Sequence, residues 1–267
     1  MKSGEMLSYF GLSEPPFTKE LPTASLHLLP SVQRNLASAR LLVDTRGIGV
    51  IAGKAGTGKT TLVRLLLDSL PPGLFKSFYL AHCSVGIVEF YTHLASLFGL
   101  EPCYRRAAMF RDLQTHILSL ATVSHVHPVL TLDEAHLLSN DILAEIRLLT
   151  NFHMDSLNAL TVILCGNETL TRKFGLSILE SLATSITITI SVESLSAEES
   201  SSYIASRIIA CGQKAPLFTK NAMTLIHQAS GGILRTIGTI ADASLLKAFL
   251  ANSKQVEPEH VQSVIQR

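Results

Sequence analysis

Several features that mark membrane, secreted or metal-binding proteins are missing from this 267-residue sequence. No apolar run reaches the roughly 18–20 residues that cross a bilayer, and the first residues lack the apolar segment of a signal peptide. The four cysteines include no C-x-x-C pair, so we predict neither a zinc site nor a disulfide framework. A net charge of +1 gives little support for nucleic-acid binding as a bulk property. We therefore expect a cytoplasmic protein, and its hydrophobic content of 47% is ample for a buried core.

The charge is unevenly spread along the chain. Residues 1–127 carry 12 Lys and Arg against 8 Asp and Glu, whereas residues 128–267 carry 10 against 13. A mildly basic half joined to a mildly acidic half suits contact of one part with nucleic acid, or head-to-tail self-association.

One motif points directly to chemistry: residues 53–60 match G-x-x-x-x-G-K-[ST] at every fixed position. The glycines allow a tight loop whose backbone N–H groups point inward around phosphates, and the following helix adds its N-terminal dipole. Lys59 is expected to reach the β- and γ-phosphates of ATP, and Thr60 to ligate Mg²⁺. The alternative is a glycine-rich turn before a helix. The residues predicted to contact the nucleotide here are Gly53, Ala55, Gly56, Thr57, Gly58, Lys59, Thr60 and Thr61.

A second nucleotide motif is predicted where the strand-like residues 129–132 run into Asp133 and Glu134. We expect Asp133 to hold Mg²⁺ with Thr60, directly or through water, and Glu134 to act as the general base. We also expect these acids and the phosphate loop to lie on neighbouring strand ends. Residues 133–136 spell the DEAH string of some helicases, but the chain has no room for the second domain that those helicases need.

Strand-like and helix-like segments alternate through the first two thirds of the chain. An extended, proline-punctuated N-terminal arm leads to a helix predicted at Gln33–Asp44. The alternation predicts an α/β fold with a parallel five-stranded sheet covered on both faces. The predicted strands are Ile48–Ala52, Phe78–Cys83, Val129–Leu132, Leu160–Cys165 and Ile186–Ser191.

The pattern becomes all-helical near residue 195. A capping box at Ser196 opens one helix through about Ala210, and Thr219 can cap a second. Leu234–Leu250 reads as a third helix, and Pro258 starts a fourth. We therefore expect three parts: an N-terminal arm and helix (1–46), a nucleotide-binding core (47–194) and a small all-helical lid domain (195–267).

Two further polar residues are predicted near the γ-phosphate. Asn167 follows the fourth strand and is the candidate sensor of the attacking water, with a turn-forming Gly-Asn as the alternative. Arg235 follows a Gly-Gly break at a helix start, where it would couple the lid to the bound nucleotide. A solvated helix arginine is the alternative for Arg235.

With these parts in order, the sequence resembles the ExeA/GspA-like group of AAA+ ATPases over nearly its whole length. The resemblance implies an AAA+ P-loop core with a helical lid, ATP held between subunits, and a ring or helical, hexamer-like oligomer. The matching pieces are residues 9–17, the phosphate loop, and residues 107–111, 132–138, 146–152, 195–199 and 231–235.

The group contains two functional types. Secretion-type members carry a membrane span and a peptidoglycan-binding region that this sequence lacks, whereas freestanding ATPases of similar size resemble the transposition regulators TniB, TnsC and IstB. The resemblance therefore implies an ATPase that oligomerises with ATP on double-stranded DNA, without sequence specificity, and recruits a transposase with or without a targeting protein. The alternatives are a secretion-associated assembly ATPase and a loader or remodeller of a protein partner.

One departure from the group concerns the arginine finger, which a neighbouring subunit supplies. The group commonly shows an arginine just before the fifth strand, whereas this chain reads Leu-Ala-Thr-Ser-Ile at residues 182–186. Because such a finger accelerates hydrolysis by several orders of magnitude, we expect slow turnover unless Arg147, Arg172 or Lys173 substitutes for it.

Candidate DNA contacts lie between the second and third strands. The candidates are Arg105 and Arg106, which directly follow Tyr104, and Arg111, with Lys76 as a further possibility. Binding of the DNA backbone by such residues would be independent of sequence and sensitive to salt. A solvated helix entrance is the alternative interpretation of each residue.

Overall fold

The computed structural model describes residues 3–18, 28–81, 84–103 and 105–266. Two compact units make up the chain. The helical unit comprises residues 1–34, 55–58 and 193–267, and the sheet unit comprises residues 35–54 and 59–192. The functional division expected at residues 46 and 194 stays a prediction. Two residues named in the sequence analysis lie outside the described residues: Tyr104, and Cys83 at the end of the second predicted strand.

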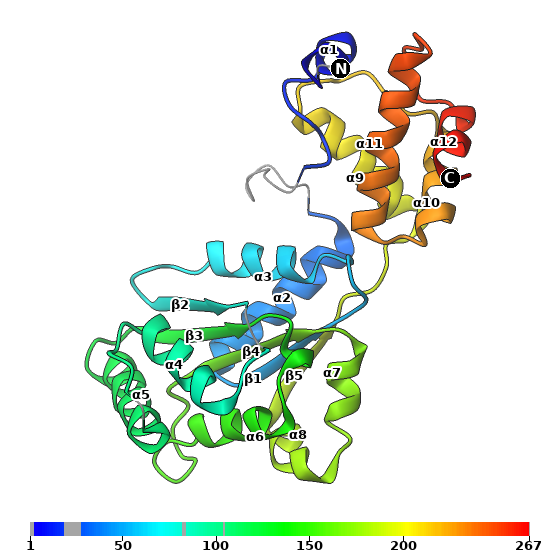
Figure 1. Cartoon of the computed structure of the whole chain (residues 1–267). Helices are drawn as coiled ribbons and strands as arrows, with labels where there is room; N and C mark the ends of the chain where they lie inside the picture. Colours follow the sequence, from blue (N-terminus) through cyan, green and yellow to red (C-terminus); the bar gives the residue numbers. More distant parts are fainter. Residues whose placement is uncertain (1–2, 19–27, 82–83, 104, 267) are drawn as a thin grey trace. The chain divides into compact units, whose positions relative to one another are not determined.

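Five parallel strands form the centre of the sheet unit, which confirms the predicted fold (Figure 1). Their spatial order is β2-β3-β4-β1-β5. The first and fifth strands have the predicted bounds, whereas the second starts at Phe75 rather than at Phe78. The strands are β1 (Ile48–Ala52), β2 (Phe75–Leu80), β3 (His127–Leu132), β4 (Thr161–Gly166) and β5 (Ile186–Ser191).

The strand order corrects one expectation about the nucleotide motifs. β1, which precedes the phosphate loop, pairs with β4 and β5, so β4 separates it from β3. The two motif-bearing strands are therefore not neighbours. Strand order depends on the edge to which each crossover connection returns, and a local sequence pattern does not encode that edge. Because the strands run parallel, their carboxyl ends still meet at one edge of the sheet.

Helices pack on both faces of this sheet (Figure 1). Val50 belongs to the apolar cluster that includes α4, α5 and α6, and the next residue, Ile51, belongs to the cluster of α2 and α3. This alternation is the two-residue period of a strand buried on both sides. The helices are α2 (Pro30–Thr45), α3 (Lys59–Asp68), α4 (Ile87–Leu97), α5 (Arg106–Thr122), α6 (Asn140–Leu149), α7 (Glu168–Lys173) and α8 (Glu180–Ser185), with the 3₁₀ turns η2 (Ala135–Leu137) and η3 (Ser177–Leu179).

Four predicted helices build the helical unit, and their sequence signals act as expected. The Ser196 side chain accepts the Glu199 amide in a reciprocal capping box, and the Thr219 side chain accepts the Ala222 amide. These helices are α9 (Ala197–Ala210), α10 (Lys220–Ser230), α11 (Leu234–Leu250) and α12 (Pro258–Ile265). Within the described part of the chain, no helix is both long and apolar enough to cross a bilayer.

The helical unit also contains a helix that the sequence analysis missed, α1 (Ser3–Phe10). Phe10 is buried in the apolar core of this unit, and its carbonyl accepts the Gln213 side-chain amide at 2.8 Å. The Ser13 hydroxyl donates to the Cys211 carbonyl at 3.0 Å. A helix this short has little stability of its own, so contacts with residues 198 and 203 positions away stabilise it.

Candidate nucleotide-binding site

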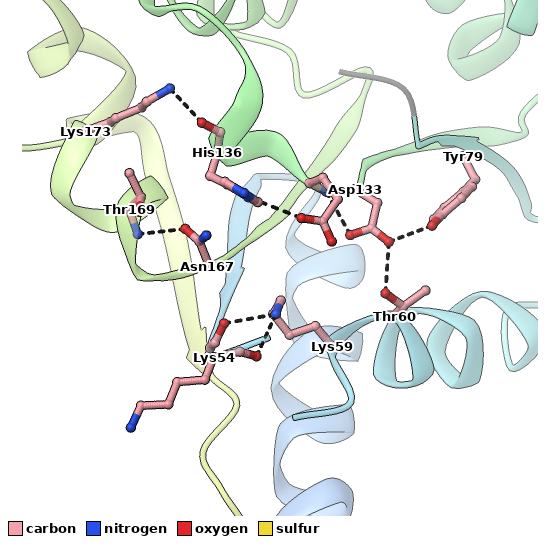
Figure 2. Close-up of polar contacts among 11 residues, drawn as sticks. Lys54, Lys59, Thr60, Tyr79, Asp133, His136, Asn167, Thr169 and Lys173 are labelled. Atoms are coloured by element: carbon pink, nitrogen blue, oxygen red, sulfur yellow. Dashed lines mark hydrogen bonds and ion pairs between the residues drawn. The ribbon is translucent and has the colours of Figure 1, made fainter. Parts of the chain in front are cut away.

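The phosphate loop leaves β1 and enters α3 at Lys59, which is buried. The Lys59 ammonium donates to the carbonyl oxygens of Gly53 and Lys54, both at 2.9 Å (Figure 2). These two carbonyls accept hydrogen bonds from the ammonium group that is predicted to face the phosphates. A bound triphosphate would therefore replace local hydrogen bonds of the loop with charge-assisted ones.

Two glycines give this loop its shape. Gly56 has φ of 83° and Gly58 has φ of 103°, values that side-chain-bearing residues rarely adopt. In the described chain, the backbone N–H groups of Ala55, Gly56 and Gly58 have no hydrogen-bond acceptor. Donors of this kind, just before a helix N-terminus, are the groups that bind phosphate oxygens.

Asp133, directly after β3, connects the Asp133–Glu134 motif to the phosphate loop. Its Oδ2 accepts the Thr60 hydroxyl at 3.0 Å and the Tyr79 hydroxyl at 2.6 Å, while Oδ1 accepts the Glu134 amide at 2.9 Å. Burial by itself raises the pKa of Asp133, but the hydrogen bonds from Tyr79, the Glu134 amide, Thr60 and Cys165 outweigh burial and lower it. Asp133 is thus held as an anion beside the Thr60 hydroxyl.

Tyr79 is a part of this site that the sequence analysis missed. It lies on the edge strand β2, in register with Thr131 of β3, and is 40% exposed. Burial and the Asp133 carboxylate raise the pKa of Tyr79, so its hydroxyl stays a donor. The only local signal was its place in an alternating strand, after buried Phe78. The register of β2 against β3, which places Tyr79 beside Asp133, cannot be predicted from the sequence.

Glu134, the predicted general base, occupies a strained turn. Its φ of 52° and ψ of 34° are left-handed, a conformation that costs a non-glycine residue on the order of 1–2 kcal/mol. The side chain is 52% exposed, so water can reach the carboxylate. His136 Nδ1 lies 3.4 Å from Glu134 Oε2, within ion-pair range but without hydrogen-bond geometry.

Asn167, the predicted sensor, lies at the end of β4 and caps α7. Its side-chain oxygen accepts the Thr169 amide at 2.9 Å (Figure 2). The oxygen thus has a structural role as the N-cap acceptor of α7. The side-chain NH₂ group has no acceptor in the described chain, which leaves its donors for a ligand.

The three candidate substitutes for the arginine finger differ in their surroundings. Arg147 makes two hydrogen bonds to the Asp155 carboxylate, at 3.1 and 2.5 Å. The Lys173 ammonium donates to the carbonyls of His136 and Leu138, at 2.8 and 2.6 Å. Arg172 is exposed, and its guanidinium has no partner in the part of the chain that the structure describes.

The candidate DNA contacts do not form one cluster. Arg106 is paired with the buried Glu145 carboxylate, which also accepts the Tyr91 hydroxyl. Arg111 is exposed, about 140° from Arg106 around α5 at 3.6 residues per turn. Arg105 is the exposed N-cap residue of α5. On the edge strand β2, the exposed Lys76 ammonium lies 5.4 Å from the centre of the Phe78 ring.

Arg235 lies in the helical unit, in the first turn of α11, and its side chain is exposed. Within that unit, the Arg235 amide donates to the Gly56 carbonyl at 3.1 Å. A Cβ added to Gly56 would lie 3.0 Å from Arg235 Cβ, so this approach requires glycine. The contact involves the backbone of Arg235, and the role of its guanidinium stays a prediction.

The residues in the sheet unit fit a magnesium ion. Mg²⁺ prefers oxygen ligands, and the Thr60 hydroxyl and the Asp133 carboxylate supply them side by side. The depressed pKa of Asp133 keeps that carboxylate charged. Together with the Lys59 ammonium, which directly precedes Thr60 in α3, these groups can bind a magnesium-bound phosphate chain.

Known proteins resemble this chain in sequence and in fold. Residues 40–174 match a family described as AAA domain. Over 255 residues, or 93% of this chain, the sequence is 32% identical to general secretion pathway protein A of Aeromonas hydrophila. The match covers 46% of that protein, so the chain spans about half the length of this relative.

Two solved structures show the same AAA+ P-loop fold. The ORC2 protein of Aeropyrum pernix, solved in ADPNP-ADP complexes, gives a TM-score of 0.71 at 15% identity, covering 96% of this chain and 72% of that one. Drosophila ORC bound to DNA gives a TM-score of 0.72 at 16% identity, covering 99% of this chain and 67% of that one. At these identities the likeness concerns the fold alone.

Proposed function

The chain belongs to the AAA domain family, and from that premise we propose that it binds Mg²⁺-ATP and hydrolyses it to ADP and phosphate. The observation that carries this proposal is the 3.0 Å hydrogen bond between Thr60 and Asp133, which joins motifs 73 residues apart. Thr60 and Asp133 would hold Mg²⁺, which when bound neutralises charge that develops on the phosphate oxygens.

The chain's other residues would take the following roles. The Lys59 ammonium turns from the loop carbonyls to the β- and γ-phosphates, and the loop amides bind phosphate oxygens. The Glu134 carboxylate takes a proton from the attacking water, while the side-chain NH₂ group of Asn167 orients that water. Arg235 is proposed to sense the γ-phosphate from the helical unit.

Two substitutions separate binding from hydrolysis. Lys59→Ala removes the charge that faces the phosphates, so we expect loss of nucleotide binding, measured with a fluorescent ATP analogue. Glu134→Gln keeps the shape but removes the base, so hydrolysis should fall by about 100-fold or more while binding is retained. Glu101→Gln, at an exposed loop position, is the matched control. A wild-type rate in Glu134→Gln would refute the proposal.

We further propose that turnover is slow in the isolated chain and rises when copies assemble into a ring or helical filament. The residue most available to act on a neighbouring copy's nucleotide is Arg172, since Arg147 and Lys173 are engaged within their own subunit. This proposal refines the sequence analysis, which left the three residues equivalent.

Of the three candidate processes from the sequence analysis, two are each favoured by an observation. The name of the Aeromonas relative favours a secretion-associated assembly ATPase, the alternative from the sequence analysis. A role on DNA, with recruitment of a transposase, is favoured by one observation: a structural neighbour is bound to DNA. The transposase partner follows from the sequence resemblance alone.

DNA binding discriminates between the candidates, and the structure sharpens the test. Fluorescence anisotropy with a duplex and ATP should show binding only for the second candidate. In that case Arg105→Ala and Arg111→Ala should each lower the slope of log affinity against log salt by about one. Arg106→Ala should change the slope less, because Glu145 already neutralises Arg106. No affinity in ATP would favour the secretion role.

A further inference from the structure

We propose that Lys173 is a positioning residue for Glu134, holding from α7 the turn that carries the general base. This inference rests on the proposed ATPase function. It assigns to Lys173 a role inside its own subunit, in place of the role across a subunit interface that its sequence position suggested.

The contacts of Lys173 are confined to one short turn. Its ammonium donates to the His136 carbonyl at 2.8 Å and to the Leu138 carbonyl at 2.6 Å (Figure 2 shows the first). These carbonyls lie in and just after η2, whose N-cap residue is Glu134. Carbonyls at the end of so short a 3₁₀ turn have few intrahelical partners, and a cation there is favourable.

The turn needs such support because its first residue is strained. Glu134 is left-handed without being glycine, so surrounding contacts must maintain its backbone. The hydrogen bond from the Glu134 N–H to the Asp133 carboxylate fixes the start of the turn. The hydrogen bonds from the Lys173 ammonium fix its end. The exposed carboxylate is thereby held in place although its side chain accepts no hydrogen bond from any residue that the structure describes.

The last residue of β4, Gly166, lies close to the same turn. A Cβ added to Gly166 would lie 3.3 Å from the His136 amide nitrogen and 3.0 Å from Leu170 Cδ2. Asn167, the proposed sensor, follows Gly166 directly and caps α7. The turn is therefore contacted by Lys173 at the end of α7 and approached by Gly166 at the end of β4, directly before the proposed sensor.

The test is a double-mutant cycle that measures ATP hydrolysis. Lys173→Met should lower kcat on the order of tenfold with the KM for ATP within about twofold, since a displaced base impairs chemistry more than binding. Lys173→Arg should recover part of the loss. In a Glu134→Gln background, Lys173→Met should cause no further loss in single-turnover hydrolysis, because the two residues act as a unit. Lys214→Met, at an exposed site in the helical unit, is the control.

Three results would overturn the proposal. Wild-type kcat in Lys173→Met, with Glu134→Gln inactive, would leave the ATPase function standing and remove the role of Lys173. An equal loss in both backgrounds would show that Lys173 acts independently of Glu134. Activity regained by mixing Lys173→Met with Glu134→Gln subunits would show that it acts across an interface. If Lys173→Met does not fold, Gly166→Ala perturbs the same turn at the His136 amide, and its kcat must fall.

Discussion

Asp133 in the sheet unit and Asp242 in the helical unit are partly or fully buried carboxyls with opposite pKa shifts. Burial acts to raise the pKa of both. At Asp133 the hydrogen bonds from neighbouring residues outweigh burial, and the pKa falls below the usual value. At Asp242, on α11, burial wins over the attraction of Arg207 and raises the pKa to about 6. The balance between burial and hydrogen-bond donors therefore decides the direction in which each pKa moves.

The largest expected effect uses the same substitution in both units. Asp133→Asn replaces an anion that accepts hydroxyl and amide donors with a neutral group, so ATP hydrolysis should fall by about 100-fold. Asp242→Asn should leave hydrolysis within about twofold of the wild-type rate. A steady-state phosphate-release assay measures both. Equal losses would show that the Asp133 carboxylate has no special function.

A smaller effect concerns stability and pH at Asp242. Because the folded pKa of about 6 lies above the ordinary value of 3.8, the folded state binds the proton more tightly, and stability falls as pH rises between these values. After discounting for partial exposure, Asp242→Asn should raise the free energy of unfolding by about 1 kcal/mol at pH 7.5. At pH 4 or below the difference should vanish. Urea titrations at the two pH values measure it, and a pH-independent difference would contradict the assignment.

The smallest effect removes one donor from Asp133. Tyr79→Phe should lower the free energy of unfolding by roughly 1 kcal/mol near pH 7, the typical contribution of one hydrogen bond. The difference should shrink as pH falls below 3.8 and Asp133 takes up a proton, because the bond to the charged form is the stronger one. Tyr9→Phe is the matched control, since Tyr9 and Tyr79 are 39% and 40% exposed. Equal effects of the two substitutions would exclude a specific role for the Tyr79 hydroxyl.

Local sequence signals predicted much of the fold. β1, β5 and α11 have the predicted bounds, because a buried strand, a strand of alternating burial and a helix with an apolar face are encoded in consecutive residues. The capping box at Ser196 likewise needs only four residues. α1 was missed because its stability comes from residues near position 211, far along the chain.

For the candidate site, motif residues were predictable and their surroundings were not. Thr60 and Asp133 meet as their motifs implied, although β4 lies between their strands. Tyr79 and Lys173 needed knowledge of the strand register and of the path of α7. Arg106 was expected to be available to DNA, but the Glu145 that pairs with it belongs to a different helix. Pairings of this kind are set by tertiary packing.

The Tyr79–Asp133 hydrogen bond also gives the protein a built-in optical reporter. The sequence has no tryptophan and only five tyrosines, so its ultraviolet emission comes from tyrosine. One of these phenols is hydrogen-bonded, at 2.6 Å, to the carboxylate proposed to face Mg²⁺. Emission from a phenol depends on the strength of such a bond. Arrival of the metal at the site can therefore be followed in unlabelled protein.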